Sequence, residues 1–140
     1  MARFDDPSKF FDQLEDGIDS AWSEYVQELQ GQLTSRAPIN TGRLASSFYI
    51  SKSSPSNSVR PEDWAPPGAK KEVKPEYTGK IVFDGTWYIT NNVPYAVFVA
   101  KDPTYGKNGR GFGSEWYNAT VTQKQKTWEA IIAKNLRKLK

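Results

Sequence analysis

The chain contains no cysteine and no histidine among its 140 residues. The absence of cysteine excludes disulfide bonds and thiolate chemistry within it. The absence of histidine removes the side chain that most often binds metals or transfers protons near neutral pH. Carboxylate pairs remain as candidate acid–base groups, but many acidic residues fall on one expected solvent-exposed helix face. We therefore expect a protein without catalytic activity, without a cofactor and without a metal site.

Long apolar runs are also missing. No stretch is apolar enough over enough residues to span a bilayer, and the first residues lack the apolar core of a signal peptide. We therefore expect a protein that is neither exported nor embedded in a membrane. A length of 140 residues with 37% hydrophobic residues suits a single domain, residues 1–140, with one core.

A long helix is expected at the N-terminal end. Asp6 and Pro7 are typical of the cap and the first position of a helix. Apolar side chains then recur at steps of three and four residues until about Ser35, which predicts one helix of roughly nine turns. The stripe comprises Phe11, Leu14, Ile18, Trp22, Tyr25 or Val26, Leu29 and Leu33. A helix of this length would extend beyond a domain of this size, and its end would need a partner.

A second helix is expected at the C-terminal end, with Ser114 as its cap and Glu115 in its first turn. The polar pair Lys124-Gln125 interrupts its apolar stripe, so a break or kink there remains open. The stripe comprises Trp116, Tyr117, Val121, Trp128, Ile131, Ile132, Leu136 and Leu139.

Strands are expected between the two helices. Residues 48–52 read as one strand, and residues 79–91 read as a hairpin whose turn is Asp84-Gly85. Residues 93–99 are apolar nearly all round, which predicts a short buried helical segment beginning at Pro94. The expected fold class is α+β, with an antiparallel sheet of three to five strands packed against the two long helices.

Residues 51–78 are rich in serine and proline, and they are too long for an ordinary connection within a compact domain. We expect an extended, projecting loop or arm, mobile in the free protein, that docks onto a partner through Trp64. The alternative is that Trp64 folds back onto the protein's own sheet.

The charge is distributed unevenly along the chain. Residues 1–33 hold eight acidic and two basic residues, whereas residues 101–140 hold nine basic and three acidic ones. This polarity favours packing of the acidic helix against the basic one, within a subunit or between neighbours. The candidate interface residues are Asp12, Glu15, Asp16, Asp19, Lys124, Lys134, Arg137 and Lys138.

The loop at residues 101–113 is rich in glycine and basic residues. It lacks the pattern of a phosphate-binding or dinucleotide-binding loop. Residues 110–113 match the opening of an RNA-recognition signature, but the following residues do not continue it. A small basic nucleic-acid-binding domain is therefore the alternative function, with Tyr105, Lys107, Arg110 and Phe112 as candidate contacts.

The connector at residues 36–48 lies between the long helix and the first strand. Pro38 ends the preceding helix, Asn40-Thr41-Gly42 reads as a turn, and Thr41 can cap the helical turn that follows. Arg43 is expected to bind backbone carbonyls or a carboxylate at this junction. The sequence Ala-Pro-Ile-x-Thr-Gly-Arg-Leu-x-x-Ser resembles the hallmark of the tail-completion, or head–tail joining, proteins of tailed bacteriophages (minor tail protein Z type). Its motif residues here are Pro38, Thr41, Gly42, Arg43 and Leu44.

The resemblance spans about residues 10–139 without the insertion at 51–78, and it follows the order helix, connector, hairpin, tyrosine-containing segment, helix. It departs from the family after Val99, where Lys101 and Asp102 stand in place of an acid and a glycine. The resemblance implies a non-catalytic structural virion protein that forms a ring, a hexamer, at the head–tail junction. It implies adjoining neck and tail proteins as partners, proximity to DNA, and assembly in the host cytoplasm.

Overall fold

The protein is described here by a computed structural model over residues 7–138, apart from the side chains of Pro103 and Tyr105. Its elements are, in chain order, α1 (Pro7–Arg36), β1 (Phe48–Lys52), β2 (Trp87–Asn91), α2 (Ala96–Lys101), α3 (Pro103–Gly106), a 3-10 turn (Gly113–Glu115) and α4 (Trp116–Leu136). The fold class is α+β, with long N-terminal and C-terminal helices, as the sequence indicates. Asp6 and Leu139 lie outside the described residues.

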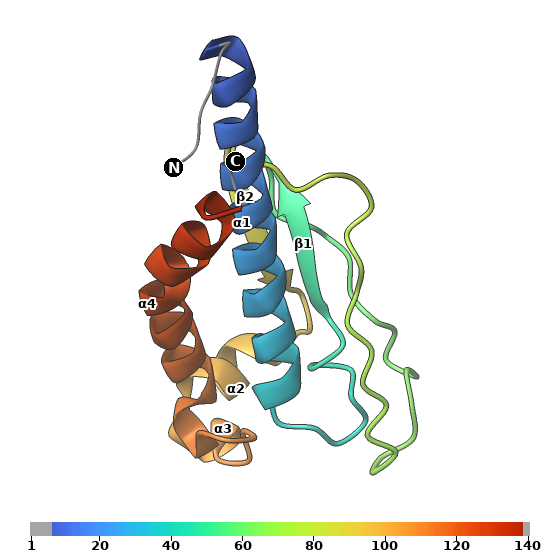
Figure 1. The fold of residues 1–140 in the computed structure, drawn as a ribbon. Coiled ribbons are helices and arrows are strands. Elements are labelled where there is room, and N and C mark those ends of the chain that lie inside the picture. Colours follow the sequence, from blue (N-terminus) through green and yellow to red (C-terminus); the bar gives the residue numbers. More distant parts are fainter. Residues whose placement is uncertain (1–6, 139–140) are drawn as a thin grey trace.

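Helix α1 is 30 residues long, which corresponds to about 45 Å at the usual rise per residue. It ends at Arg36, two residues before Pro38, in agreement with the sequence analysis. Figure 1 shows α4 running beside α1 and ending near its middle, so that the N-terminal turns of α1 extend past α4. The rings of Trp22, Tyr25 and Trp128 pack edge-on where the two helices meet.

The sheet contains two antiparallel strands among residues 7–138, fewer than the three to five expected. Phe48 pairs with Asn91, and the register continues to Lys52 paired with Trp87. The expected hairpin at 79–91 is wrong, because only its second half is a strand. The first half has other partners for its backbone: the Phe83 amide donates to Asp19 of α1 (2.8 Å), and the Val82 carbonyl accepts the Trp87 indole N–H (2.9 Å).

Helix α2 has one face in the core and one in solvent. Ala96, Val99 and Ala100 pack against the core, whereas Val97 and Phe98 are 63% and 59% exposed. The expectation that this segment is buried all round is therefore wrong. Positions 97 and 98 lie on the opposite side of the helix from positions 96, 99 and 100, since an α-helix has 3.6 residues per turn. The helix also begins at Ala96, two residues after Pro94.

Helix α4 begins at Trp116, one residue later than a cap at Ser114 implies, because a 3-10 turn occupies Gly113–Glu115. Ser114 is therefore not its cap. The helix then continues without a break through Lys124-Gln125 to Leu136. Trp116 is the largest fully buried side chain, at 1% exposure. It packs against Gly109, where any Cβ would collide with the indole ring.

Candidate interaction surfaces

The connector is held by hydrogen bonds to residues 70–71 of the long loop. The amides of Lys70 and Lys71 donate to the carbonyls of Asn40 and Thr41, both at 2.9 Å. The Thr41 hydroxyl accepts the Arg43 amide at 3.1 Å, as expected for a cap. Gly42 has φ +95°, and a Cβ there would collide with the Lys71 carbonyl. Only glycine therefore fits the approach of these two backbone segments.

Arg43 binds a backbone carbonyl, as the sequence analysis expected. Its Nε donates to the carbonyl of Arg60 at 2.8 Å, and Arg60 Nε in turn donates to the carbonyl of Ser46 at 2.9 Å. The buried Leu44 places its side chain in the main core cluster, and Pro38 is half-buried beside the turn. The motif residues thus join the end of α1, the start of β1 and the long loop.

The loop at 51–78 returns to the connector in this structure. The Trp64 indole N–H donates to the Lys71 carbonyl at 2.7 Å. The cationic groups of Lys71 and Arg60 lie 4.1 and 4.7 Å from the centre of its ring. Buried Gln30 of α1 donates to the Pro75 carbonyl at 2.7 Å. Trp64 therefore folds back onto its own chain, against the loop itself rather than against the sheet. Its role as an anchor for a partner stays a prediction.

The acidic and basic helices pair within one subunit. Lys124 binds Glu28 at 2.8 Å and Lys134 binds Glu24 at 2.6 Å. The hydrogen bond from Lys134 lowers the pKa of Glu24 below its ordinary value; burial opposes this shift, and the charge of Lys134 adds to it. The expected acidic partners lie nearer the N-terminus of α1, and Asp19 among them accepts the Phe83 amide. Within residues 7–138, Asp12, Glu15 and Asp16 form no ion pair with Arg137 or Lys138.

Arg110 closes the C-terminal end of α1. Its Nε donates to the Ala37 carbonyl (2.9 Å), its Nη2 donates to the Thr34 carbonyl (2.8 Å), and its amide donates to the Arg36 carbonyl (2.7 Å). Its guanidinium also forms an ion pair with Glu72 of the long loop at 2.5 Å. The last carbonyls of a helix have no hydrogen-bond donors within the helix, and the Arg110 side chain donates hydrogen bonds to them here. The sequence analysis assigned Arg110 to nucleic acid and missed this role.

Phe112 is also engaged within the chain. The guanidinium of Arg36 lies 4.5 Å from the centre of its ring and also donates to Gln123 of α4 at 2.8 Å. Phe112 keeps 39% of its surface exposed. Lys107 is exposed, and the side chain of Tyr105 lies outside the described part. Of the four candidate nucleic-acid contacts, two are therefore used to hold the loop against α1.

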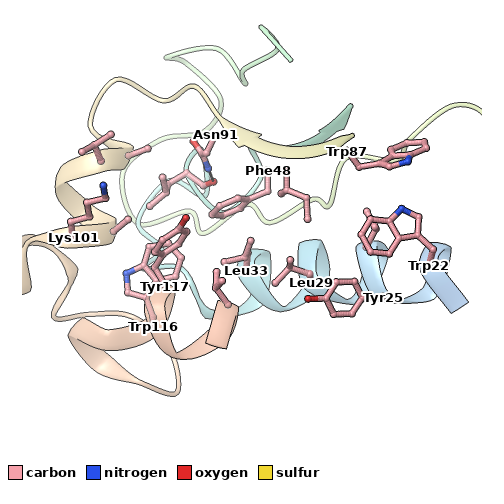
Figure 2. Close-up of a pocket in the computed structure, with 17 residues that line it drawn as sticks. Trp22, Tyr25, Leu29, Leu33, Phe48, Trp87, Asn91, Lys101, Trp116 and Tyr117 are labelled. Carbon is pink, nitrogen blue, oxygen red and sulfur yellow. Dashed lines mark hydrogen bonds between the residues drawn. The ribbon is translucent and has the colours of Figure 1, made fainter. Parts of the chain in front are cut away.

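An apolar groove lies between the sheet and the helices, with a volume of about 500 Å³. Figure 2 shows Trp87 opposite Trp22 and Tyr25 at one end, and Lys101 near Trp116 and Tyr117 at the other. Lys101 is the one charged residue in the described lining. The groove is defined here by Leu29 of α1, Phe48 of β1, Ile89 of β2, Ala100 of α2, and Tyr117 and Val121 of α4. The groove was not predicted from the sequence, because its lining comes from elements that lie far apart along the chain.

Within residues 7–138, no group of three or more acidic residues is arranged to hold a metal ion. In the same range, no helix combines the length and apolarity needed to cross a membrane. A scan against protein-family models, a search of curated proteins and a search of solved structures each found no match for this chain.

Proposed function

We propose that this chain is a non-catalytic structural component of a tailed bacteriophage, a tail-completion or neck protein that forms a ring at the head–tail junction. The observation that carries the proposal is the connector at residues 36–48. Its sequence resembles the motif of that family, and it occupies the place between a long N-terminal helix and the first strand that the resemblance requires. The proposed partners are other copies of the chain, in a hexameric ring, and adjoining neck and tail proteins in the virion.

The physical requirements of such a part are met by features of this molecule. A ring component needs a rigid body whose surfaces remain accessible to neighbours. Here Arg43 and Arg110 fix the connector, the end of α1 and the long loop to one another through short hydrogen bonds, and Gly42 allows the close approach of the loop backbone. Apolar side chains of α2 stay exposed on the same molecule. Exposed apolar surface next to a groove is typical of protein–protein interfaces.

The experiment is a native mass measurement of the purified chain over a range of protein concentrations, with a parallel titration by double-stranded DNA at low and high salt. We expect a closed oligomer of one defined mass and no tight DNA affinity. A chain that stays monomeric at every concentration and binds DNA in a salt-dependent manner would contradict the proposal. That result would favour the nucleic-acid-binding alternative.

A further inference from the structure

The first turns of α1 extend past the end of α4 (Figure 1), and residues 7–18, of which Gly17 is buried, are named the overhang here. Phe11 on this overhang is 62% exposed. The half-buried Leu14 and Ile18 continue the stripe at the three- and four-residue steps of a helix. Complete burial of an exposed phenylalanine side chain is favourable by about 1.5–3 kcal/mol. The overhang therefore presents an apolar stripe of the kind that helices place in grooves.

The apolar groove is the complementary surface on the same molecule. Aromatic and aliphatic side chains from α1, the sheet, α2 and α4 line it, and it has a volume of about 500 Å³. Strand β2 pairs with β1 on one side, and the described chain places no third strand on its other side. The exposed Val97 of α2 adds apolar surface at the rim. An occupant with an apolar stripe would fit this lining.

Charge identifies which occupant fits. The overhang carries the carboxylates of Asp12, Glu15 and Asp16 against one ammonium, that of Lys9. The charged residue of the groove is Lys101, at one end of the lining (Figure 2). An acidic helix with an apolar stripe therefore matches the groove in both charge and polarity.

The overhang cannot reach the groove of its own molecule. The overhang is part of α1, which is one continuous helix from Pro7 to Arg36, and the same helix supplies one wall of the groove, beginning at Trp22. A rigid helix cannot fold back over its own next turn. Any overhang that fills a groove must therefore come from a second copy. A contact between two different surfaces of identical chains is heterologous, and it closes into a ring when the rotation between copies permits.

We propose that the α1 overhang of one copy docks in the apolar groove of the next, with Phe11 as its anchor and its carboxylates facing Lys101. This inference rests on the proposed ring function and deepens it, because it names the two surfaces that meet. It also gives the outward-facing side of α2 a role, since Val97 borders the docked helix.

The test uses cysteines introduced into a chain that has none, so background disulfides are absent. Glu15→Cys lies one turn from Phe11 on the overhang, and Val97→Cys lies at the groove rim. When the two single variants are mixed and oxidised, we expect a covalent dimer that neither variant forms alone. The control mixes Glu15→Cys with Lys126→Cys, an exposed position on α4 outside the groove lining, and should give no dimer.

A second variant tests the anchor itself. Phe11→Ser should weaken assembly by about tenfold or more, whereas the matched control Val73→Ser, at an exposed position of the long loop, should leave assembly unchanged. One outcome overturns the docking inference and leaves the ring proposal standing. In that outcome the parent forms rings, the mixture of Glu15→Cys and Val97→Cys gives no cross-link, and Phe11→Ser assembles normally. A parent that stays monomeric without cross-links overturns both.

An apolar dye, 8-anilinonaphthalene-1-sulfonate, distinguishes a different occupant. In the assembled protein the docked helix should exclude the dye from the groove, and Phe11→Ser should admit it. Three results together would assign the groove to a small apolar ligand and overturn the inference. They are dye binding to the intact assembly, loss of that binding in Val97→Asp, and no cross-link between Glu15→Cys and Val97→Cys.

Discussion

The connector and the groove both adjoin α1, but they differ in how completely their hydrogen-bonding and apolar groups are satisfied. Around the connector, the carbonyls of Asn40, Thr41 and Ser46 and the side chains of Arg43 and Ser46 form hydrogen bonds with residues 60–73. Around the groove, apolar side chains line an open space, and the indole N–H of Trp22 is buried without a hydrogen-bond partner among the described residues. The first region is satisfied within one chain, whereas the second leaves apolar side chains along an open groove.

The comparison predicts that substitutions near the connector act on folding and that substitutions near the groove act on assembly. The largest folding effect is expected for Gly42→Ala. Its φ of +95° is strained for alanine, and the new Cβ would collide with the Lys71 backbone. We expect a loss of about 3 kcal/mol or more in the free energy of unfolding, measured by denaturant titration.

Gly68→Ala is the matched control for that substitution. Gly68 also has a positive φ, +82°, but a Cβ there meets nothing within 4 Å. The free energy of unfolding of Gly68→Ala should fall by about 1 kcal/mol, from backbone strain alone. Equal losses for the two variants would show that the close approach of Lys71 to the connector does not matter.

The second prediction concerns Arg110→Ala. The variant leaves the carbonyls of Thr34 and Ala37 at the end of α1 without their donors. We expect a loss of about 1–3 kcal/mol in the free energy of unfolding. Lys107→Ala, in the same loop, should change it by less than about 0.5 kcal/mol. A normal stability of Arg110→Ala combined with lost DNA affinity would return Arg110 to a nucleic-acid role.

The third prediction concerns Arg43→Lys. A lysine cannot reproduce the fixed geometry of the guanidinium that bonds the Arg60 carbonyl. The expected loss in thermal stability corresponds to about 0.5–1.5 kcal/mol, the range for one hydrogen bond. If the melting temperature and assembly both equal those of the parent, the connector is only a turn, and its resemblance to the phage motif is coincidental.

The smallest effect is expected for the exposed ion pair of Glu24 and Lys134. Because folding lowers the pKa of Glu24, its contribution is present above the unfolded pKa and is lost as the pH falls through the folded pKa. The pair should contribute about 0.2–1 kcal/mol. Unfolding of the parent and of Glu24→Gln, compared from about pH 6 down to about pH 3, should converge at the acidic end. If the difference in unfolding free energy between the parent and Glu24→Gln does not change with pH, the Glu24–Lys134 ion pair is excluded as its source.

Sequence patterns predicted the parts of the fold that depend on interactions between residues close together in the sequence. The apolar steps from Phe11 to Leu33 and the stop at Pro38 give α1, and Thr41 and Gly42 give the turn. The strand expected at 79–83 failed, because Asp19, more than sixty positions away in the sequence, binds the Phe83 amide. Ser114 failed as a cap because packing of Trp116 against Gly109 sets where α4 begins.

The same distinction, between contacts near in the sequence and distant ones, applies to the candidate sites. Arg43 was predicted to bind a carbonyl at the junction, since its neighbours in the sequence build that junction. The role of Arg110 could not be predicted, because its partners at Thr34 and Ala37 come from the distant end of α1. The groove could not be predicted for a related reason: its lining comes from segments far apart in the sequence, from Trp22 of α1 to Val121 of α4.

The most direct test of the account is electron microscopy of the purified assembly, with images classified by rotational symmetry. The account predicts closed rings of one size, six-fold by the family resemblance, that disappear in Phe11→Ser and persist in Val73→Ser. Monomers, two-fold dimers or open filaments of the parent chain would contradict it.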